Sequence, residues 1–260
     1  INVESIEELE EIAIICKRIN RTINICLRVN PNVDAKTHEK ISTGRSEDKF
    51  GISDKKVFEI FKKFKSNKFV KIKGLSMHIG SQIVLLEPFY KAFRKIKLQI
   101  LKLKREGFEV SSLDLGGGIG IKYNDNNKIL DIKSYAQVID ELFSDLDLEI
   151  IIEPGRYLVG SSGIILSRVI RTKSGDNKNF VIIDAGMDNL IRPALYGAEH
   201  KIIPVKKKKQ TNPKNYDIVG PICETSDVFI KKMKIHRLNS DDLVVICSTG
   251  AYSSCMASQY

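Results

Sequence analysis

The chain has 260 residues, 42% of them hydrophobic and 28% charged, and this near-average composition excludes a largely disordered protein. Lys and Arg number 42 against 32 Asp and Glu, which gives a formal net charge of +10. The basic excess gathers in lysine-rich stretches such as residues 206–209, a predicted polar loop, and aromatic residues are only 7% with no Trp. A stacking platform for single-stranded nucleic acid is therefore not expected, and a solvated basic surface is.

No apolar run approaches the ~20 residues that cross a bilayer, so we expect no membrane association. The five cysteines are odd in number and lack CxxC spacing. A disulfide framework or a structural zinc site is therefore not expected, and the reducing cytoplasm is the expected location.

The first half of the chain alternates helix-like and strand-like segments. Ser5 and Glu8 form a capping box at the start of the first helix. Apolar spacing predicts helices at 6–19, 57–64, 88–105 and 134–146, and strands at 24–29, 71–79, 112–115 and 149–152. Such βα alternation is typical of a parallel sheet with crossover helices.

After Glu153 the pattern changes to strands with few helical segments between them. The predicted strands are 164–171, 180–184, 217–219 and 243–247. We therefore expect two domains, an α/β domain over 1–160 and a mainly β domain over 161–260.

About four βα units are visible, whereas a closed (β/α)8 barrel of the TIM type needs eight. The parallel sheet is either open or the later half of a barrel whose first strands lie upstream. The start at Ile1 in place of Met favours the second interpretation, and the end at Tyr260 suggests a second truncation.

Each of the last three strands of the first half ends in a polar or glycine-rich cluster. These clusters are His78 to Gln82, Gly116 to Gly120 and Glu153 to Arg156. In parallel βα architectures the carboxyl ends of the strands converge on the active site, so these residues are candidates for function.

Each cluster also has an ordinary interpretation. Gly116 to Gly118 form either a flexible loop or a turn whose N–H groups approach a phosphate closely. His78 is either a structural or a catalytic histidine, and it lacks a second ligand at metal-binding spacing. Glu153 and Arg156 form either a surface ion pair or, for Glu153, a carboxylate that needs a cationic partner such as a protonated heterocycle.

Three further motifs lie in the second half. Cys223 is either a buried cysteine or, between Pro221 and Glu224, a thiol in a shaped loop that can donate a proton. The segments 192–196 and 250–252 would each be ordinary loops if taken alone.

Taken together, these clusters resemble the fold type III, alanine-racemase-like family of pyridoxal-phosphate enzymes, and within it the diaminopimelate decarboxylases. The matching motifs agree in order and rough spacing and cover nearly the whole chain. They are Thr43-Gly44, Lys49-Phe50-Gly51, His78-Ile79-Gly80-Ser81-Gln82, Gly116-Gly117-Gly118, Glu153-Pro154-Gly155-Arg156, Arg192-Pro193-Ala194-Leu195-Tyr196, Gly220-Pro221-Ile222-Cys223-Glu224 and Gly250-Ala251-Tyr252.

The resemblance implies a (β/α)8 barrel, of which only the later half is present, followed by a mainly β domain. It also implies a homodimer with shared active sites. The implied reaction is the decarboxylation of meso-2,6-diaminopimelate to L-lysine and CO2, the last step of lysine biosynthesis, with pyridoxal phosphate as the electron sink.

The resemblance also implies roles for individual residues. His78 stacks on the pyridine ring, and Glu153 pairs with its nitrogen. The cofactor phosphate is held by Ser81, Gly116, Gly117 and Gly118 and by the turn Pro154-Gly155-Arg156. Substrate is bound by Arg156, Arg192, Tyr196, Glu224 and Tyr252, of which Tyr252 also touches the cofactor, and Cys223 donates the proton after CO2 leaves. Cys223 and Glu224 reach the active site from the partner subunit.

Specificity in this interpretation follows from charge, because an arginine and a glutamate together can bind the zwitterionic distal end of diaminopimelate. Carboxynorspermidine, arginine and ornithine decarboxylases remain alternatives. Further alternatives are a catalytically inactive homologue that binds a partner and a general phosphate-ligand binding protein.

One departure from the family is the absence of its motif for the lysine that holds pyridoxal phosphate. That motif lies on the first barrel strand, which the half barrel does not contain. We therefore expect the 260-residue chain by itself neither to close its barrel nor to turn over substrate.

Overall fold

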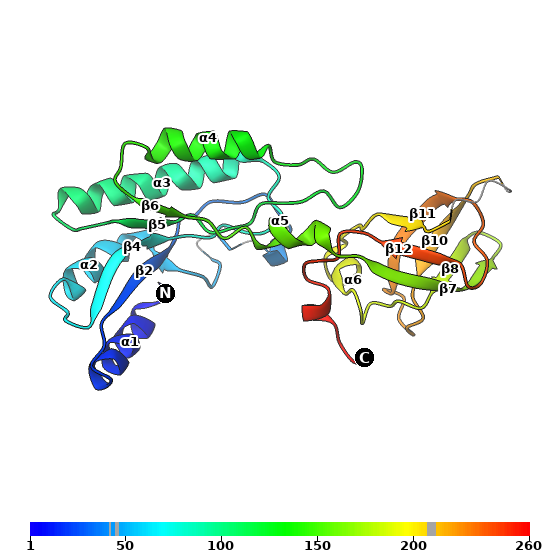
Figure 1. The fold of residues 1–260 in the computed structure, drawn as a ribbon, viewed down its shortest axis with the longest axis horizontal. Coiled ribbons are helices and arrows are strands. Elements are labelled where there is room, and N and C mark those ends of the chain that lie inside the picture. Colours follow the sequence, from blue (N-terminus) through cyan, green and yellow to red (C-terminus); the bar gives the residue numbers. More distant parts are fainter. Residues whose placement is uncertain (42, 45–46, 207–211) are drawn as a thin grey trace. The chain divides into compact units, whose positions relative to one another are not determined.

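The structure is a computed structural model that describes residues 1–41, 43–44, 47–206 and 212–260. It divides into two compact units (Figure 1). Unit 1 comprises Ile1–Gly120 and Ile129–Pro154, and unit 2 comprises Ile121–Lys128 and Gly155–Tyr260. Of the predicted lysine-rich loop, residues 207–209 lie outside the described residues.

Unit 1 is built on a parallel sheet, as the βα alternation predicts. Its strands run in the order β1-β2-β4-β5-β6, with β3 paired to β2, and every pair is parallel. The strands are β1 (Asn2–Val3), β2 (Ile23–Asn30), β3 (Ile52–Ser53), β4 (Val70–Ser76), β5 (Ser112–Asp114) and β6 (Glu149–Ile151). The predicted α/β class with part of a barrel is confirmed.

Four helices connect these strands, and each was expected from its apolar spacing. They are α1 (Ile6–Arg18), α2 (Asp54–Phe64), α3 (Leu86–Arg105) and α4 (Ile132–Phe143), with a short 3-10 turn, η1 (Glu39–Ile41). The predicted capping box is present in part, since the Ser5 hydroxyl accepts a hydrogen bond from the Glu8 N–H at 3.1 Å.

The core of unit 1 lies between the sheet and the helices α3 and α4, which run side by side (Figure 1). Phe89 and Phe93 on α3 contact Tyr135 on α4 with ring centroids 5.0 and 5.8 Å apart. β4 and β5 approach closely at Gly74, where a Cβ would lie 1.8 Å from the Ser112 carbonyl oxygen. This packing fixes the strand ends that carry the candidate residues.

Unit 2 contains a mixed sheet in the order β11-β10-β8-β7-β12-β9. β8 and β10 are parallel, and the other neighbours pair antiparallel. The strands are β7 (Ile165–Ser174), β8 (Asn179–Ile183), β9 (Ile202–Pro204), β10 (Lys214–Val219), β11 (Val228–Ile235) and β12 (Leu243–Ile246). Buried residues from all six strands, including Val181, Ile218 and Ile246, form its core.

Short helical segments complete unit 2: α5 (Gly155–Val159), η2 (Gly160–Ser162), α6 (Arg192–Tyr196) and η3 (Ser254–Met256). The interpretation of 192–196 as a loop was wrong, because this segment is α6. Its start carries Pro193, and it ends at Gly197 in the left-handed conformation with φ of 60°. Within the described part of the chain, no helix is both long and apolar enough to span a bilayer.

Candidate active site

The candidate residues of unit 1 lie where three neighbouring parallel strands end. β4 leads to His78 and Ser81, β5 to Gly116–118, and β6 to Glu153 and Pro154. The segments after β4 and β5 lie against each other, since the Ile83 N–H donates to the Gly118 carbonyl at 2.9 Å. We call this group the strand-end cluster.

The His78 ring is half-buried and held in one orientation. Its Nδ1 accepts a hydrogen bond from the Gly117 N–H at 3.2 Å, so the ring proton sits on Nε2. Burial, and then the positive charge of Arg28, lower the pKa of His78 below its ordinary value. Its backbone carbonyl accepts from the Thr43 hydroxyl at 2.9 Å, which explains the Thr43-Gly44 motif as a support for this strand end.

The three glycines do not form a flexible loop, because each packs against a backbone carbonyl. A Cβ on Gly116, Gly117 or Gly118 would lie 2.0–2.2 Å from the carbonyl oxygens of Met77, Glu153 and Gly80, respectively. Gly116 and Gly118 also have φ of 66° and 93°, which favour glycine. The chain therefore forms a rigid turn from bare backbone, the kind of surface that an anion can approach closely.

Glu153 forms a carboxyl pair with Asp114, a residue that the sequence analysis did not single out. Asp114 is 3% exposed and accepts hydrogen bonds from the Gly116 N–H at 2.8 Å and from the Asn2 side chain at 2.7 Å. Glu153 itself is exposed, and loss of hydration, followed by the charge and hydrogen bond of Asp114, raises its pKa. A carboxyl group with this tendency to hold a proton suits a partner that is itself a weak base.

A second polar group supports the strand ends from β2. Arg28 forms an ion pair with Glu4 and places its guanidinium 5.0 Å from the Phe50 ring centroid. The Glu4 carboxylate also accepts from the Gly51 N–H at 2.7 Å, and Gly51 has φ of 75°. The Lys49-Phe50-Gly51 motif therefore holds the arginine that lowers the pKa of His78.

The candidate residues of unit 2 centre on two arginines, Arg156 and Arg192, which are 7% and 4% exposed. The Arg192 guanidinium lies 4.2 Å from the Tyr123 ring centroid, and that of Arg156 lies 4.5 Å from the Tyr252 ring centroid. Arg156 also donates to the Tyr123 hydroxyl. We call Tyr123, Arg156, Arg192 and Tyr252 the arginine cluster.

The arginine cluster has an unused donor. The Nε of Arg192 is buried and has no hydrogen-bond partner within the described chain. Burial lowers the pKa of Arg192, because charged groups are costly to remove from water without a counter-ion. The cluster therefore fits an anion, and a carboxylate can accept from a guanidinium through two oxygens.

His200 is a further buried member of this region that the sequence analysis missed. It is 1% exposed, and its Nε2 lies 2.6 Å from the Arg192 Nη1. Burial lowers its pKa to about 4, so the imidazole is neutral at pH 7. Tyr196, the other predicted substrate residue here, lies half-buried at the end of α6.

Cys223 and Glu224 lie in the loop between β10 and β11, and both are exposed. The interpretation of Cys223 as a buried cysteine is therefore wrong. Asp227, which the sequence analysis also missed, is 3% exposed and accepts from the Ile222 N–H and the Met187 N–H, both at 2.8 Å. This buried carboxylate fixes the loop that presents the thiol.

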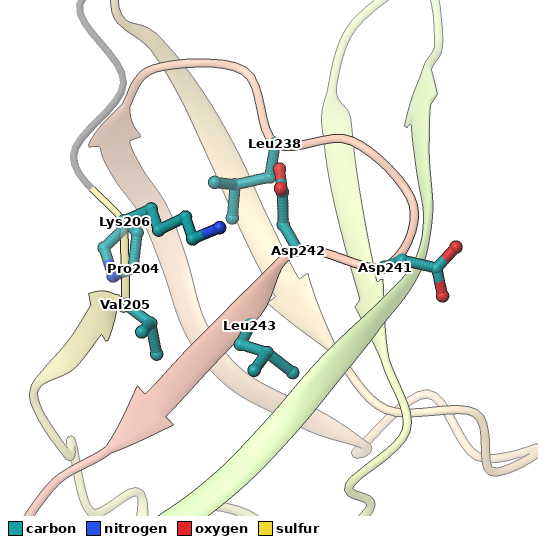
Figure 2. Close-up of a pocket in the computed structure, with 7 residues that line it drawn as sticks. All are labelled: Pro204, Val205, Lys206, Leu238, Asp241, Asp242 and Leu243. Atoms are coloured by element: carbon teal, nitrogen blue, oxygen red, sulfur yellow. The ribbon is translucent and has the colours of Figure 1, made fainter.

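A small cavity of about 120 Å³ lies elsewhere in unit 2, beside the start of β12 (Figure 2). None of the predicted site residues lines it. Its Asp242 carboxylate accepts from the Asn239 N–H at 2.6 Å, and Asp241 points away from Lys206 and lies 3.5 Å from Arg168. These acidic residues shape a turn, so the cavity is not part of the candidate site. Over the described ranges, no three His, Cys, Asp or Glu residues are grouped to hold a metal ion.

The sequence and the fold agree with one enzyme class. Residues 1–160 match the family described as pyridoxal-dependent decarboxylase, pyridoxal binding domain. The chain belongs to the pyridoxal-dependent decarboxylases, whose cofactor is pyridoxal phosphate.

Among known members, the chain is similar to diaminopimelate decarboxylases. It is 44% identical over 259 residues to that of Neisseria meningitidis serogroup A and 40% identical over 260 residues to that of Zymomonas mobilis. The crystal structure of the Helicobacter pylori diaminopimelate decarboxylase complexed with L-lysine superposes with a TM-score of 0.94 at 41% identity. All of this chain is covered in each comparison, but it spans only 61–64% of the length of these relatives.

Proposed function

We propose that the protein containing this chain is a pyridoxal-phosphate-dependent decarboxylase that converts meso-2,6-diaminopimelate to L-lysine and CO2, the last step of lysine biosynthesis. The observation that carries the proposal is the buried guanidinium of Arg192 with its unpartnered Nε. Such a donor calls for a carboxylate, and diaminopimelate keeps one after the other has been lost. The names of the relatives support the same substrate.

The strand-end cluster fits the cofactor. The imidazole of His78 is planar, neutral and fixed by Gly117, so it can stack on a pyridine ring. The carboxyl group of Glu153 can share one proton with the ring nitrogen, and its raised pKa makes it a good partner for a weakly basic nitrogen. The rigid turn at Gly116, Gly117 and Gly118 gives the phosphate a close approach to backbone, and Ser81 offers a hydroxyl.

Further phosphate contacts fall on the turn that follows Glu153. Pro154 restricts the backbone there, and Gly155 opens α5, where a Cβ would meet nothing within 4 Å. When bound, pyridoxal phosphate accepts the electron pair that CO2 loss leaves on the substrate carbon.

The arginine cluster then binds the distal carboxylate of the substrate. Arg156 and Arg192 supply charge, and the hydroxyls of the half-buried Tyr196 and the exposed Tyr252 can donate to the same group. Glu224 binds the distal ammonium group. The two charges together select a zwitterionic end and disfavour lysine-like, ornithine-like or arginine-like ends that lack the carboxylate.

Cys223 supplies the proton that completes the reaction. The bond between the α-carbon and its carboxylate breaks, CO2 leaves, and a proton from the Cys223 Sγ replaces it on carbon. The thiolate regains a proton from solvent. The exposure of Cys223 on a loop fixed by Asp227 supports a role at a neighbouring subunit's site, and we propose a homodimer on this ground. The five free cysteines support a location in the reducing cytoplasm.

The test uses the full-length reading frame that encodes this chain, supplied with pyridoxal phosphate. CO2 release is measured from meso-diaminopimelate, with ornithine, arginine and carboxynorspermidine as competing substrates. Release from diaminopimelate alone, lost in Cys223→Ala, is the expected result. CO2 release from another substrate would assign a different substrate specificity. The absence of CO2 release from every substrate, despite bound cofactor, would refute the decarboxylase proposal.

A further inference from the structure

His200 makes two hydrogen bonds that together define its protonation state. Its Nε2 lies 2.6 Å from the Arg192 Nη1, and its Nδ1 lies 2.9 Å from the carbonyl oxygen of Cys247. A guanidinium has only donors, so the Nε2 has to be the acceptor. A carbonyl is only an acceptor, so the Nδ1 carries the proton and donates it. Both neighbours therefore require the same neutral tautomer.

The surroundings of His200 prevent the ring from flipping, so its two nitrogens cannot exchange their donor and acceptor roles. The ring is 1% exposed and meets Tyr123 edge-on with centroids 4.8 Å apart. Arg192 and Arg156 contribute positive charge to this region, which disfavours a further proton on the imidazole.

Tyr123 belongs to the segment Ile121–Lys128, which we call the strap and which is fixed to the rest of unit 2 by hydrogen bonds. The Tyr123 carbonyl accepts from the Lys201 N–H at 2.9 Å, the Lys201 side chain bonds to Asp125 at 2.8 Å, and Asn124 donates to Glu199 at 3.0 Å. The residues on both sides of His200 are therefore tied to the strap, and the Arg192 guanidinium contacts both the Tyr123 ring and the His200 Nε2.

We propose that His200 is a positioning residue for substrate recognition, which holds the Arg192 guanidinium in the orientation that leaves its Nε free for the substrate carboxylate. The proposal rests on the carboxylate-binding role of Arg192 given under Proposed function. Because the imidazole is neutral, it fixes Arg192 without adding a charge of either sign that would compete with the substrate.

A matched pair of uncharged substitutions separates the two hydrogen bonds of His200. In H200Q the side-chain carbonyl can reach the place of Nε2 and accept from Arg192. In H200N the shorter amide can replace Nδ1 and donate to Cys247, but it leaves Arg192 without its acceptor. H236N, on a half-buried histidine of the same unit, controls for the loss of an imidazole.

The probes are L-lysine, which keeps the distal carboxylate of diaminopimelate, and cadaverine, which has no carboxylate. Titration calorimetry on the cofactor-loaded full-length protein is expected to show L-lysine binding ~10–100-fold weaker in H200N, with H200Q and H236N within ~3-fold of wild type. Cadaverine binding is expected to change little in any variant. In turnover, H200N is expected to raise the KM for diaminopimelate more than it lowers kcat.

Equal effects of H200Q and H200N, or equal weakening of L-lysine and cadaverine, would overturn the inference. A second measurement needs no variant: ¹⁵N NMR of histidine-labelled protein is expected to find His200 as the neutral Nδ1–H tautomer from pH 8 to pH 5. Detection of the Nε2–H tautomer would also overturn it. If wild type releases no CO2 but L-lysine binding is lost in H200N and kept in H200Q, the proposed reaction fails while the role of His200 stands.

Discussion

The substitution Gly117→Ala tests whether the triple glycine is a rigid turn imposed by backbone packing. A Cβ at this position would lie 2.0 Å from the Glu153 carbonyl oxygen, and real Cβ atoms essentially never come closer than 3.0 Å to such an atom. The carbonyl therefore has to retreat by about 1 Å. Unlike Gly116 and Gly118, Gly117 does not have a positive φ, so the principal effect of the added Cβ is this steric collision and not backbone strain.

The loss of stability follows from what holds Glu153. Its N–H donates to the Gly116 carbonyl at 2.8 Å, so the retreat breaks this bond and leaves buried backbone groups unpaired. A lost bond with an unsatisfied partner costs about 1–3 kcal/mol, and overpacking adds about 1–3 kcal/mol. We expect Gly117→Ala to lower the free energy of unfolding by about 2–6 kcal/mol, measured by urea unfolding of the full-length protein.

Gly107→Ala provides the control in the same unit. Gly107 has φ of 77°, but a Cβ there meets nothing within 4 Å. Its replacement should cost only the left-handed backbone penalty of about 1–2 kcal/mol. If Gly117→Ala is no more destabilising than Gly107→Ala, the packing argument is refuted and the triple glycine is a soft loop after all.

Three further predictions concern the core, the thiol loop and pH. Phe93→Ala empties a fully buried position and should lower the free energy of unfolding by about 3–5 kcal/mol; a loss below 1 kcal/mol in urea unfolding would contradict the described core. Asp227→Asn turns an acceptor of two backbone N–H groups into a partial donor, so it should cost about 1–3 kcal/mol and reduce CO2 release. Unchanged stability and activity would show that Asp227 does not fix the loop. His200 takes up a proton near pH 6.5 when unfolded but only near pH 4 when folded, so wild type should lose stability as pH falls between these values. From pH 7 to pH 5 wild type should lose about 2 kcal/mol more than H200Q in urea unfolding, and parallel losses would contradict the buried neutral state.

Long elements with strong periodicity were predictable from the sequence. α3 places Phe89, Phe93, Ile96 and Ile100 on one buried face, which is the spacing that predicts a helix. The parallel sheet followed from the same alternation. β1 and β3 have two residues each and owe their existence to pairing with β2, so no local pattern could reveal them.

α6 and β11 are elements that the sequence analysis did not predict. α6 is five residues long, too short for periodicity, although Pro193 and Gly197 were start and stop signals that could have located it. β11 contains five apolar residues, but they do not alternate regularly because three lysines lie among them, and the sequence analysis did not predict a strand there. Its strand conformation comes from pairing with β10.

Motifs at strand ends identified His78 and Glu153 as candidates, because such residues stand next to apolar runs. Asp114, His200 and Asp227 were missed, since each acts through a partner distant in sequence. His200 meets the Cys247 carbonyl 47 positions along the chain, and Asp227 meets Met187 at a separation of 40. One available signal was the carboxylate of Asp114, which lies two residues before the first of three consecutive glycines, where Asp commonly initiates a turn.

The strap gives the chain an order of assembly during synthesis. Residues Ile121–Lys128 interrupt the sequence of unit 1, yet they belong to unit 2, so their contacts cannot form when they leave the ribosome. Asp125 has to wait for Lys201, which is 76 positions further on. At ordinary translation rates this delay is ~4–15 s. During that interval the α/β unit can fold around a loop that has no partner, and the buried arginine pair can form only when the strap is captured.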